Sequence, residues 1–293
     1  GGTESDNLAI QGISGHIVTT VSEHPAILEP CKRRGNVTYI KVDADGIVNP
    51  DDIKNVLQPD TGLISVIYAN NEIGTIQPIR EISKIKGKAY FHTDACQASE
   101  YLNLKVETLG VDMMTLNASK IYGPKGVGIL YKKFGIKIIP QIFGGGQEGG
   151  LRSGTESPVL CAGMAGALLI AEKNKKDETK KIAELRDYFI KKVLDEIPNA
   201  ELNGSEKNRL PNNANFYFKG CNAEELLIKL DFKGIACSSG SACKARLCTP
   251  SYVILALGKE EAALSSIRFS LGRETSKKDL DCVIKVLCEI LNH

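Results

Sequence analysis

The chain has 293 residues, of which 42% are hydrophobic and 25% are charged, the balance of a globular protein. Its 37 basic and 35 acidic side chains nearly cancel, so bulk charge supports neither direct binding to nucleic acid nor binding to a membrane surface. No apolar run is long enough to span a bilayer, and the polar opening stretch does not read as a signal peptide.

The nine cysteines are an odd number and are spread unevenly, which does not fit a disulfide framework in a chain of this length. Free thiols favour a reducing compartment. We therefore expect a cytoplasmic protein, or a mitochondrial one if a targeting segment once preceded the first residue.

The first half of the chain alternates strand-like and helix-like stretches, which predicts an α/β fold with a mainly parallel sheet. In such sheets ligands bind beyond the carboxyl ends of the strands, where Asn71, Asp94 and Lys120 fall. The predicted strands cover 16–20, 63–68, 89–93, 113–116 and 127–131, and the predicted helices cover 51–57 and 79–85.

The second half has a different pattern. A long helix is predicted from Ala162 to about Ile197, with the charged run 172–181 as a solvated face. The elements that follow indicate a smaller α+β domain, so we expect a large domain over 1–172 and a small one over 173–293. Beyond the long helix the predicted strands cover 215–218 and 267–270, and the predicted helices cover 223–230, 252–257 and 278–291.

Lys120 and Asp94 form a candidate cofactor pair, each just past a strand. A lysine that binds pyridoxal phosphate (PLP) works with a carboxylate on the pyridine nitrogen. The alternatives are a surface lysine and a carboxylate that caps a helix. Near the start, Gly1-Gly2-Thr3 reads as a glycine turn that leads into a helix, whose N-terminus could hold phosphate.

Cys243 lies in a loop of small residues, Ser238-Ser239-Gly240-Ser241-Ala242-Cys243. Such a cysteine can act as a nucleophile if nearby cations, here Lys244 and Arg246, favour its thiolate. The alternatives are a buried structural cysteine and a metal ligand. The spacings between Cys237, Cys243 and Cys248 do not fit the two close pairs of a zinc site, so we predict no metal.

Arg268 lies within an apolar strand, where burial of a charge is unfavourable unless it meets an anion. Its guanidinium suits a carboxylate, such as that of an amino-acid substrate. An internal salt bridge would explain it equally well.

Together these segments resemble the cysteine desulfurases, PLP enzymes of the class V aminotransferase type. The resemblance implies the PLP-dependent transferase fold type I, with a mainly parallel sheet of seven-stranded type in the large domain and a smaller α+β C-terminal domain. It also implies that the N-terminal part of the small domain is missing here. The motifs that carry it are Gly2-Thr3-Glu4-Ser5-Asp6-Asn7, Asn70-Asn71-Glu72-Ile73-Gly74, His92-Thr93-Asp94-Ala95-Cys96-Gln97, Lys120-Ile121-Tyr122-Gly123-Pro124-Lys125-Gly126, Arg152-Ser153-Gly154-Thr155 and the Cys243 loop.

The resemblance implies a role for each cofactor residue. Lys120 would attach to PLP and Asp94 would pair with the ring nitrogen. Gln97 and Asn71 would bind the ring's phenolic oxygen, while His24 would stack on the ring and take part in proton transfer. The phosphate would be held by Thr3, by Ser119 and, from a neighbouring subunit, by Thr155, which implies a homodimer.

The resemblance likewise implies the reaction. Arg268, with Asn71, would hold the carboxylate of L-cysteine, and Cys243 would take its sulfur as a persulfide and leave L-alanine. The sulfur would pass to an iron–sulfur scaffold or another acceptor protein, for cluster assembly or tRNA thiolation. Two alternatives remain: a selenocysteine lyase, and a truncated homologue that binds partners without catalysis.

The sequence departs from the family at three positions. Ser119 stands where the family usually has histidine, Asn117 where it favours serine, and a glycine follows Glu148 where a basic residue is common. Two of these positions normally help hold phosphate, so we expect phosphate binding to be weaker or arranged differently.

Overall fold

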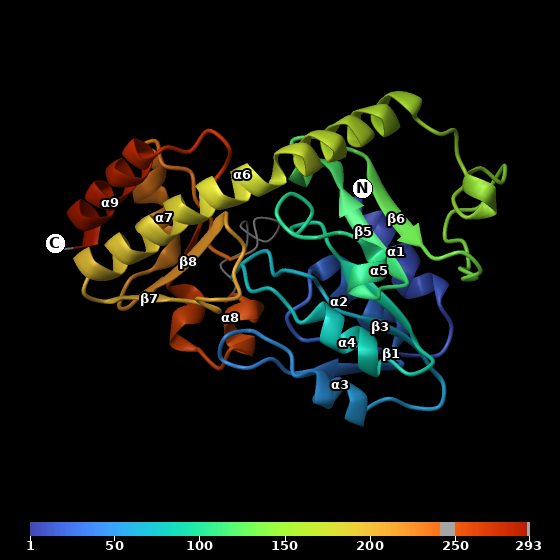
Figure 1. The fold of residues 1–293 in the computed structure, drawn as a ribbon. Coiled ribbons are helices and arrows are strands. Elements are labelled where there is room, and N and C mark those ends of the chain that lie inside the picture. The colour runs from blue at the N-terminus through green and yellow to red at the C-terminus, as the bar shows by residue number, and fades with distance from the viewer. Residues whose placement is uncertain (241–249, 292–293) are drawn as a thin grey trace. The chain divides into compact units, whose positions relative to one another are not determined.

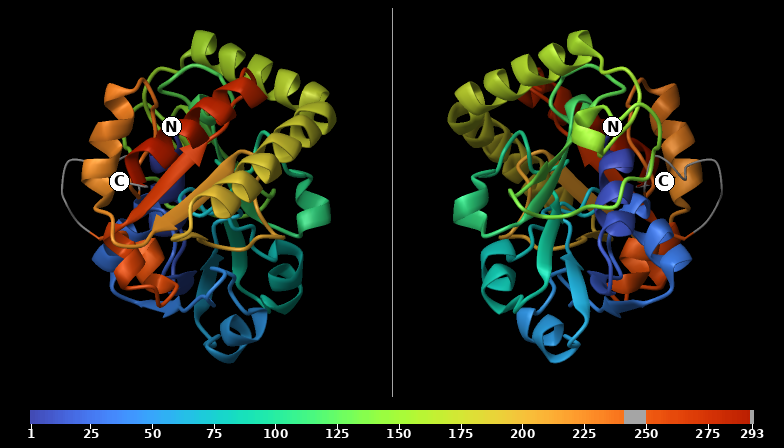
Figure 2. Two further views of the ribbon diagram at one scale, coloured as in Figure 1. Left: turned by 90° about the vertical axis from the view of Figure 1, so that its left-hand side faces the viewer. Right: turned by 90° about the vertical axis from the view of Figure 1, so that its right-hand side faces the viewer.

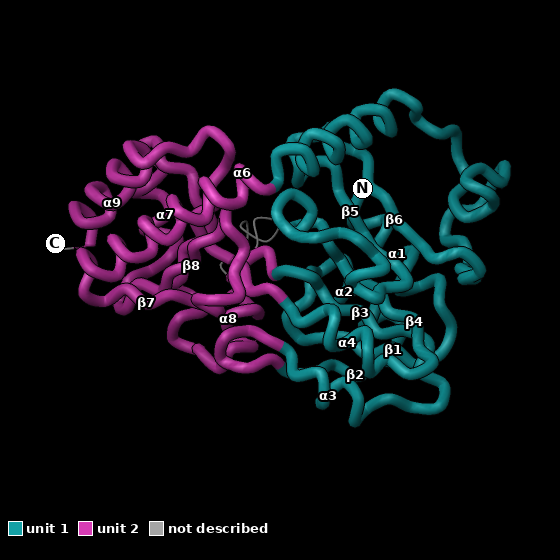
Figure 3. The backbone as a smooth tube through the Cα atoms, in the orientation of Figure 1, with its two compact units in different colours: residues 1–41, 48–69, 77–175 teal, residues 42–47, 70–76, 176–293 magenta. Residues whose placement is uncertain are grey.

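The structure, a computed structural model, describes residues 1–240 and 250–291. The chain divides into two compact units, coloured separately in Figure 3. Unit 1 comprises 1–41, 48–69 and 77–175, and unit 2 comprises 42–47, 70–76 and 176–293. Two short segments of the first half, 42–47 and 70–76, therefore belong with the C-terminal part of the chain.

Unit 1 is built on a sheet of six strands in the order β2-β1-β3-β4-β5-β6. Figure 1 labels four of them, β1, β3, β5 and β6. The first five are parallel to their neighbours and β6 is antiparallel to β5, so the mainly parallel sheet is confirmed, with six strands in the described chain. Its strands are β1 His16–Thr20, β2 Val37–Ile40, β3 Thr61–Ser65, β4 Tyr90–Asp94, β5 Met113–Asn117 and β6 Gly128–Lys132.

Helices cover both faces of this sheet. In the right-hand view of Figure 2, the strands of unit 1 lie between the N-terminal helices α1 and α2 on one side and α3, α4 and α5 on the other. The α1–α2 side is an apolar cluster that includes Ile10, Ile17, Ile27, Leu63 and Met113. The helices are α1 Gly2–Gly12, α2 Pro25–Arg34, α3 Pro50–Asn55, α4 Ile79–Ile85 and α5 Val106–Leu109, followed by α6 Pro158–Glu196, which ends in unit 2.

Unit 2 contains a three-stranded antiparallel sheet in the order β7-β8-β9. Phe189 on α6 meets Phe216 and Phe269 edge-on, with ring centroids 5.6 and 5.3 Å away, and these rings form the centre of the unit's core. The elements are β7 Ala200–Leu202, β8 Asn213–Phe218, α7 Ala223–Phe232, α8 Tyr252–Ala256, β9 Ser266–Ser270 and α9 Lys277–Leu291.

Most predicted elements are present, with ends shifted by a few residues. The strand over 16–20 and the helix over 79–85 have the predicted bounds. The prediction of a glycine turn at the N-terminus is wrong, because α1 already begins at Gly2 and Thr3 lies in its first turn. No helix in the described ranges is long and apolar enough to cross a bilayer.

Candidate functional site

Three of the predicted site residues follow the carboxyl ends of parallel strands in unit 1. His24 comes after β1, Asp94 ends β4, and Lys120 lies just beyond β5. Burial lowers the pKa of His24 most, while the charge of Asp94 raises it and the charge of Lys120 lowers it. Because both charges act on one imidazole, the three groups share one electrostatic environment at this edge of the sheet.

The turn after β4 fixes the Asp94 carboxylate. Asp94 is 5% exposed, and its Oδ1 accepts a hydrogen bond of 2.9 Å from the backbone N–H of Cys96. Burial, followed by the charges of Asp94 and Asp6, raises the pKa of the Cys96 thiol. Gln97 lies half-buried in the same turn.

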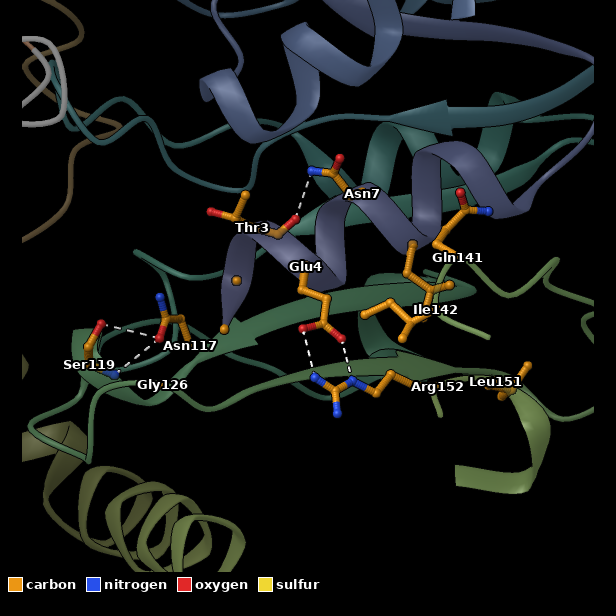
Figure 4. A pocket seen from close by; sticks show the side chains of 13 residues that line it. Thr3, Glu4, Asn7, Asn117, Ser119, Gly126, Gln141, Ile142, Leu151 and Arg152 are labelled. Atoms are coloured by element: carbon orange, nitrogen blue, oxygen red, sulfur yellow. Dashed lines mark hydrogen bonds and ion pairs between the residues drawn. The ribbon is translucent and has the colours of Figure 1, made fainter. Parts of the chain in front are cut away.

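Lys120 is exposed and ends a short 3₁₀ turn, Ala118–Lys120, that leaves the end of β5. Asn117 caps this turn: its Oδ1 accepts from both the backbone N–H and the hydroxyl of Ser119, each at 3.2 Å (Figure 4). Asn117 and Ser119, two of the positions that depart from the family pattern, are therefore hydrogen-bonded to each other and stabilise the turn that carries Lys120.

A cavity of about 610 Å³ lies at the N-terminus of α1 in unit 1 (Figure 4). Among the described residues no side chain caps this helix, so its first backbone N–H groups are available to an anion. A side chain at Gly2 would come within 3.0 Å of Cys96 Sγ, which explains the glycine. The cavity is lined by Gly1, Gly2, Thr3, Glu4, Asn7, Leu8, Asn117, Ser119, Gly126, Gln141, Ile142, Leu151 and Arg152.

The lining fits a phosphate group, because it combines a helix N-terminus with the hydroxyl of Thr3 and the side-chain amide of Asn117. The hydroxyl of Ser119 would serve as a further donor only by turning away from Asn117 Oδ1. Across the cavity, Arg152 Nε and Nη2 donate to the two carboxylate oxygens of Glu4 at 2.8 and 3.3 Å. The hydrogen bond from Arg152 lowers the pKa of Glu4. Lys120, Asp94, Gln97 and His24 are not part of this lining.

Thr155 is exposed and lies outside the cavity at α1. It lines a second cavity of about 670 Å³ in unit 1, which is bounded by β6, by the start of α6 and by the N-terminal residues Gly1, Glu4, Ser5 and Leu8. Thr155 and the start of α1 therefore line this second cavity together.

Asn71 and Arg268 lie together in unit 2. Arg268, on β9, donates from Nη1 to the backbone oxygen of Asn71 at 2.9 Å. Asn71 Oδ1 is buried and has no hydrogen-bond partner among the described residues. Cys243 and its two neighbouring cations, Lys244 and Arg246, lie outside the described residues.

Two buried carboxyl groups near Asp94 were not predicted from the sequence. Glu23 is fully buried, and its Oε1 accepts from Thr20 Oγ1 at 2.8 Å and from the N–H of Ile67 at 2.9 Å. Burial raises the pKa of Glu23 to about 8. Asp6, on α1, is 1% exposed, and burial together with the charge of Asp94 raises its pKa well above the usual range.

A buried histidine lies beside one of these acids, with His92 Nε2 3.9 Å from Asp6 Oδ1. His92 Nδ1 is 2.9 Å from Ser65 Oγ and its Nε2 is 3.0 Å from Thr115 Oγ1. Burial lowers the pKa of His92 to about 3, so the ring is neutral at ordinary pH.

The spacing of Asp6 to Gly2, Ala9 and Ile10, all on the buried face of α1, is the sequence signal that could have identified the buried acid.

His24 also has a structural contact that the sequence reading missed. It is the N-cap of α2, and its Nδ1 accepts a hydrogen bond of 3.1 Å from the N–H of Ala26. Because Nδ1 accepts, the proton of the neutral ring belongs on Nε2. The α2 start therefore fixes both the orientation and the tautomer of this imidazole.

Glu23→Gln is expected to remove part of the chain's pH-dependent loss of stability. Folded Glu23 keeps its proton up to about pH 8, whereas the unfolded chain releases it near 4.5. The group's contribution to stability is therefore complete below pH 4.5 and is lost as the pH rises through 8, a change on the order of 4 kcal/mol. Glutamine keeps the acceptor for Thr20 and Ile67 and has no proton to release.

Urea unfolding at pH 5, 6.5 and 8 measures this effect. Relative to the wild-type chain, Glu23→Gln should gain stability progressively toward pH 8. Glu29→Gln is the matched control, because Glu29 is exposed and pairs only with the exposed Lys32 in the described structure. Equal pH slopes in the wild-type chain and Glu23→Gln would show that the buried carboxyl is not protonated.

Among the described residues, no group of three or more His, Cys, Asp or Glu side chains could hold a metal ion. All seven cysteines in the described part of the chain are free.

Comparison with known proteins identifies the chain's relatives. A family model described as aminotransferase class-V matches residues 1–283. The chain is 46% identical to the cysteine desulfurase IscS of Dictyoglomus turgidum, over 99% of this chain and 77% of that protein. The X-ray structure of a NifS-like protein from Rickettsia africae superimposes with a TM-score of 0.92 at 33% identity, covering 100% of this chain and 80% of that one.

A structure of SspA in complex with cysteine is also similar, with a TM-score of 0.78 and 33% identity over 92% of this chain and 79% of that one. The expected fold class is thus confirmed by solved structures that share it.

Proposed function

The chain is a member of the class-V aminotransferase family, and from that premise we propose that it is a PLP-dependent cysteine desulfurase that receives sulfur on Cys243. One observation carries the proposal: the half-buried His24, Asp94 and Lys120 all stand at the carboxyl ends of parallel strands of one sheet, β1, β4 and β5. This is the combination of carboxylate, imidazole and amine that a PLP site needs.

The residues of unit 1 would hold the cofactor. Thr3, Ser119 and the α1 N-terminus support phosphate binding, Asp94 would pair with the ring nitrogen, and Gln97 would contact the phenolic oxygen. Bound PLP supplies an electron sink that stabilises negative charge on the amino acid it carries. Lys120 would attach to the cofactor and, once displaced by substrate, would move a proton at the substrate Cα.

The residues of unit 2 would handle the substrate and its sulfur. Arg268 and Asn71 would hold the carboxylate and orient L-cysteine. The Cys243 thiolate would form a bond with the substrate sulfur as the carbon–sulfur bond breaks, so that L-cysteine and a thiol become L-alanine and a persulfide. The persulfide sulfur would then pass to an iron–sulfur scaffold or another acceptor protein.

A homodimer is part of the proposal. Thr155 would contribute to the phosphate site of a second copy, which its exposed position supports. Large apolar side chains on the same stretch of unit 1 are exposed, among them Phe143 at 79% and Val159 at 80%. Mixing a Thr155→Ala chain with a Lys120→Ala chain tests this. If each active site combines Lys120 of one chain with Thr155 of the other, the mixed dimer contains one intact site and should regain activity, whereas sites built from a single chain would all stay defective.

The experiment that tests the function measures L-alanine and sulfide from L-cysteine, with a reductant and added PLP. The proposal expects both products in equal amounts at early times. The same assay with selenocysteine distinguishes a selenocysteine lyase, which would act on selenocysteine and poorly on cysteine. Absence of both activities in a PLP-loaded, folded dimer would favour a non-catalytic binding protein.

A further inference from the structure

The 70–76 segment carries Asn71 within unit 2, and two side-chain amides of β8 bind its backbone. The backbone oxygen of Glu72 accepts from Asn213 Nδ2 at 3.1 Å and from Asn215 Nδ2 at 3.0 Å. Both asparagines are buried, so water does not compete for these bonds. The residue next to Asn71 is therefore fixed by the central strand of the three-stranded sheet.

Each of the two amides is oriented by a donor to its oxygen. Asn213 Oδ1 accepts from Arg209 Nη1 at 3.0 Å, and Asn215 Oδ1 accepts from Asn203 Nδ2 at 2.9 Å. Because the oxygen of each amide is engaged in this way, its NH₂ group is the end that faces Glu72. Arg209 Nη2 also donates to the backbone oxygen of Asn203, so one guanidinium supports both amides.

Arg209 is a buried cation, and its acceptors in the described chain are three neutral oxygens. It is 3% exposed, and its Nε completes the set with a hydrogen bond of 2.9 Å to the backbone oxygen of Ser205. Burial, followed by the charge of Arg186, lowers the pKa of Arg209 to about 10, so the guanidinium still carries its charge at neutral pH. A buried charge is unfavourable unless its donors are satisfied, and these oxygens satisfy them.

The backbone of Arg209 also pairs with the segment. Thr75 and Arg209 form an isolated antiparallel β-bridge. Beside it, the N–H of Ile76 donates to the backbone oxygen of Asn208 at 2.8 Å. The backbone of Arg209 thus holds the end of the segment, while its side chain, through Asn213, holds the middle.

We propose that Arg209 is a positioning residue for the amino-acid substrate. Acting through Asn213, it fixes the backbone beside Asn71 and so sets where Asn71 lies relative to Arg268, which donates to the Asn71 backbone oxygen. Asn71 Oδ1 is buried without a partner among the described residues, as expected of a group that binds a ligand. The inference rests on the proposed function, in which Asn71 and Arg268 hold the substrate carboxylate.

Asn213→Asp separates this role from a general loss of fold. Aspartate keeps an acceptor for Arg209 and adds an ion pair with it, but it has no N–H to donate to Glu72. We expect the KM for L-cysteine to rise at least about fivefold, with kcat changed less than about threefold and the PLP absorption band intact. Urea unfolding should give a stability close to wild type, because the ion pair offsets the lost hydrogen bond.

Hydrogen exchange supplies a readout that needs no activity. The backbone N–H groups of Asn70, Gly74 and Ile76 are all hydrogen-bonded. In Asn213→Asp they should exchange at least about tenfold faster than in the wild-type chain, because the middle of the segment is released. Exchange in α9 should stay unchanged, which shows that unit 2 remains folded.

Arg209→Met and Arg186→Met form a matched pair. Both arginines are buried, but the described contacts of the Arg186 side chain are with Asp187 and with the backbone oxygens of Arg209 and Leu210. Arg209→Met should raise KM at least about fivefold, Arg209→Lys less, and Arg186→Met less than about twofold. Equal rises in the two methionine variants would overturn the proposal, because they would reflect the loss of a buried cation alone.

Two results for Asn213→Asp would also overturn it. Wild-type KM and exchange would show that the amide does not hold the segment, and faster exchange with a wild-type KM would show that the segment serves the fold alone. A wild-type chain that binds PLP but forms no alanine would instead refute the proposed function. The dissociation constant of L-cysteine, measured from the PLP band, would then test whether Arg209 positions the substrate.

Discussion

Lys120→Ala is expected to abolish the visible absorption band that the wild-type chain acquires with PLP, and to lower alanine formation by at least about a thousandfold. The lysine is exposed at the end of a capped turn, and it acts on the same imidazole as Asp94. Alanine removes both the amine that attaches to the cofactor and the base that moves the substrate proton.

Lys125→Ala is the control for this variant. Lys125 is an exposed lysine five positions along the same motif, and its loss should leave band and rate within about twofold of wild type. Absorption titration with PLP and a single-turnover alanine assay measure the two effects. A normal band in Lys120→Ala would mean that another amine holds the cofactor, and the assignment of Lys120 would then be wrong.

Cys243→Ser should keep the PLP band and lose sulfide release by about a thousandfold or more, since an alcohol cannot form a persulfide. The band depends on unit 1, and Cys243 belongs to unit 2 by sequence position. Cofactor binding and sulfur transfer should therefore separate in this variant. Trapping with a thiol-alkylating reagent followed by mass spectrometry would find the persulfide on the peptide that contains residue 243 in the wild-type chain alone.

Cys237→Ser gives the matched comparison, six residues earlier. Burial raises the pKa of the Cys237 thiol to about 11, so at neutral pH it is a poor nucleophile. This variant should release sulfide at close to the wild-type rate. If Cys243→Ser were active and Cys237→Ser inactive, the sulfur acceptor would have been assigned to the wrong cysteine.

Strands and long helices of the fold could be predicted because their apolar periodicity is strong. Buried runs such as His16–Thr20 identify central strands, and the α6 pattern persists over many turns. The edge strand β2 and the short β7 were missed, because their residues are largely half-exposed and do not alternate clearly. The start of α1 was placed too late, since Gly1-Gly2 reads locally as a turn while tertiary packing against β5 and β6 makes Gly2 helical.

The site was partly predictable for a similar reason. Residues that follow strand ends, such as Asp94 and Lys120, could be found from strand position alone. Glu23 could not, because acidic side chains are usually exposed, whereas the spacing of Asp6 to the buried face of α1 was a usable signal. The sequence shows that Asn117 and Ser119 replace the residues usual at two positions of the phosphate site. The hydrogen bonds between them depend on the backbone turn and are evident only from the structure.

The hydrogen bond between His24 and the start of α2 couples the protonation state of the imidazole to the capping of that helix. A doubly protonated imidazole has no lone pair left for the Ala26 N–H, so proton uptake at Nδ1 breaks the cap bond at the start of the helix. Mutagenesis at this position therefore changes two properties at once, and a loss of turnover in an alanine variant would be ambiguous. His24→Asn distinguishes the two effects, because asparagine can still cap the helix but has no imidazole ring. A loss of turnover in His24→Asn would therefore reflect the missing ring and not the missing cap.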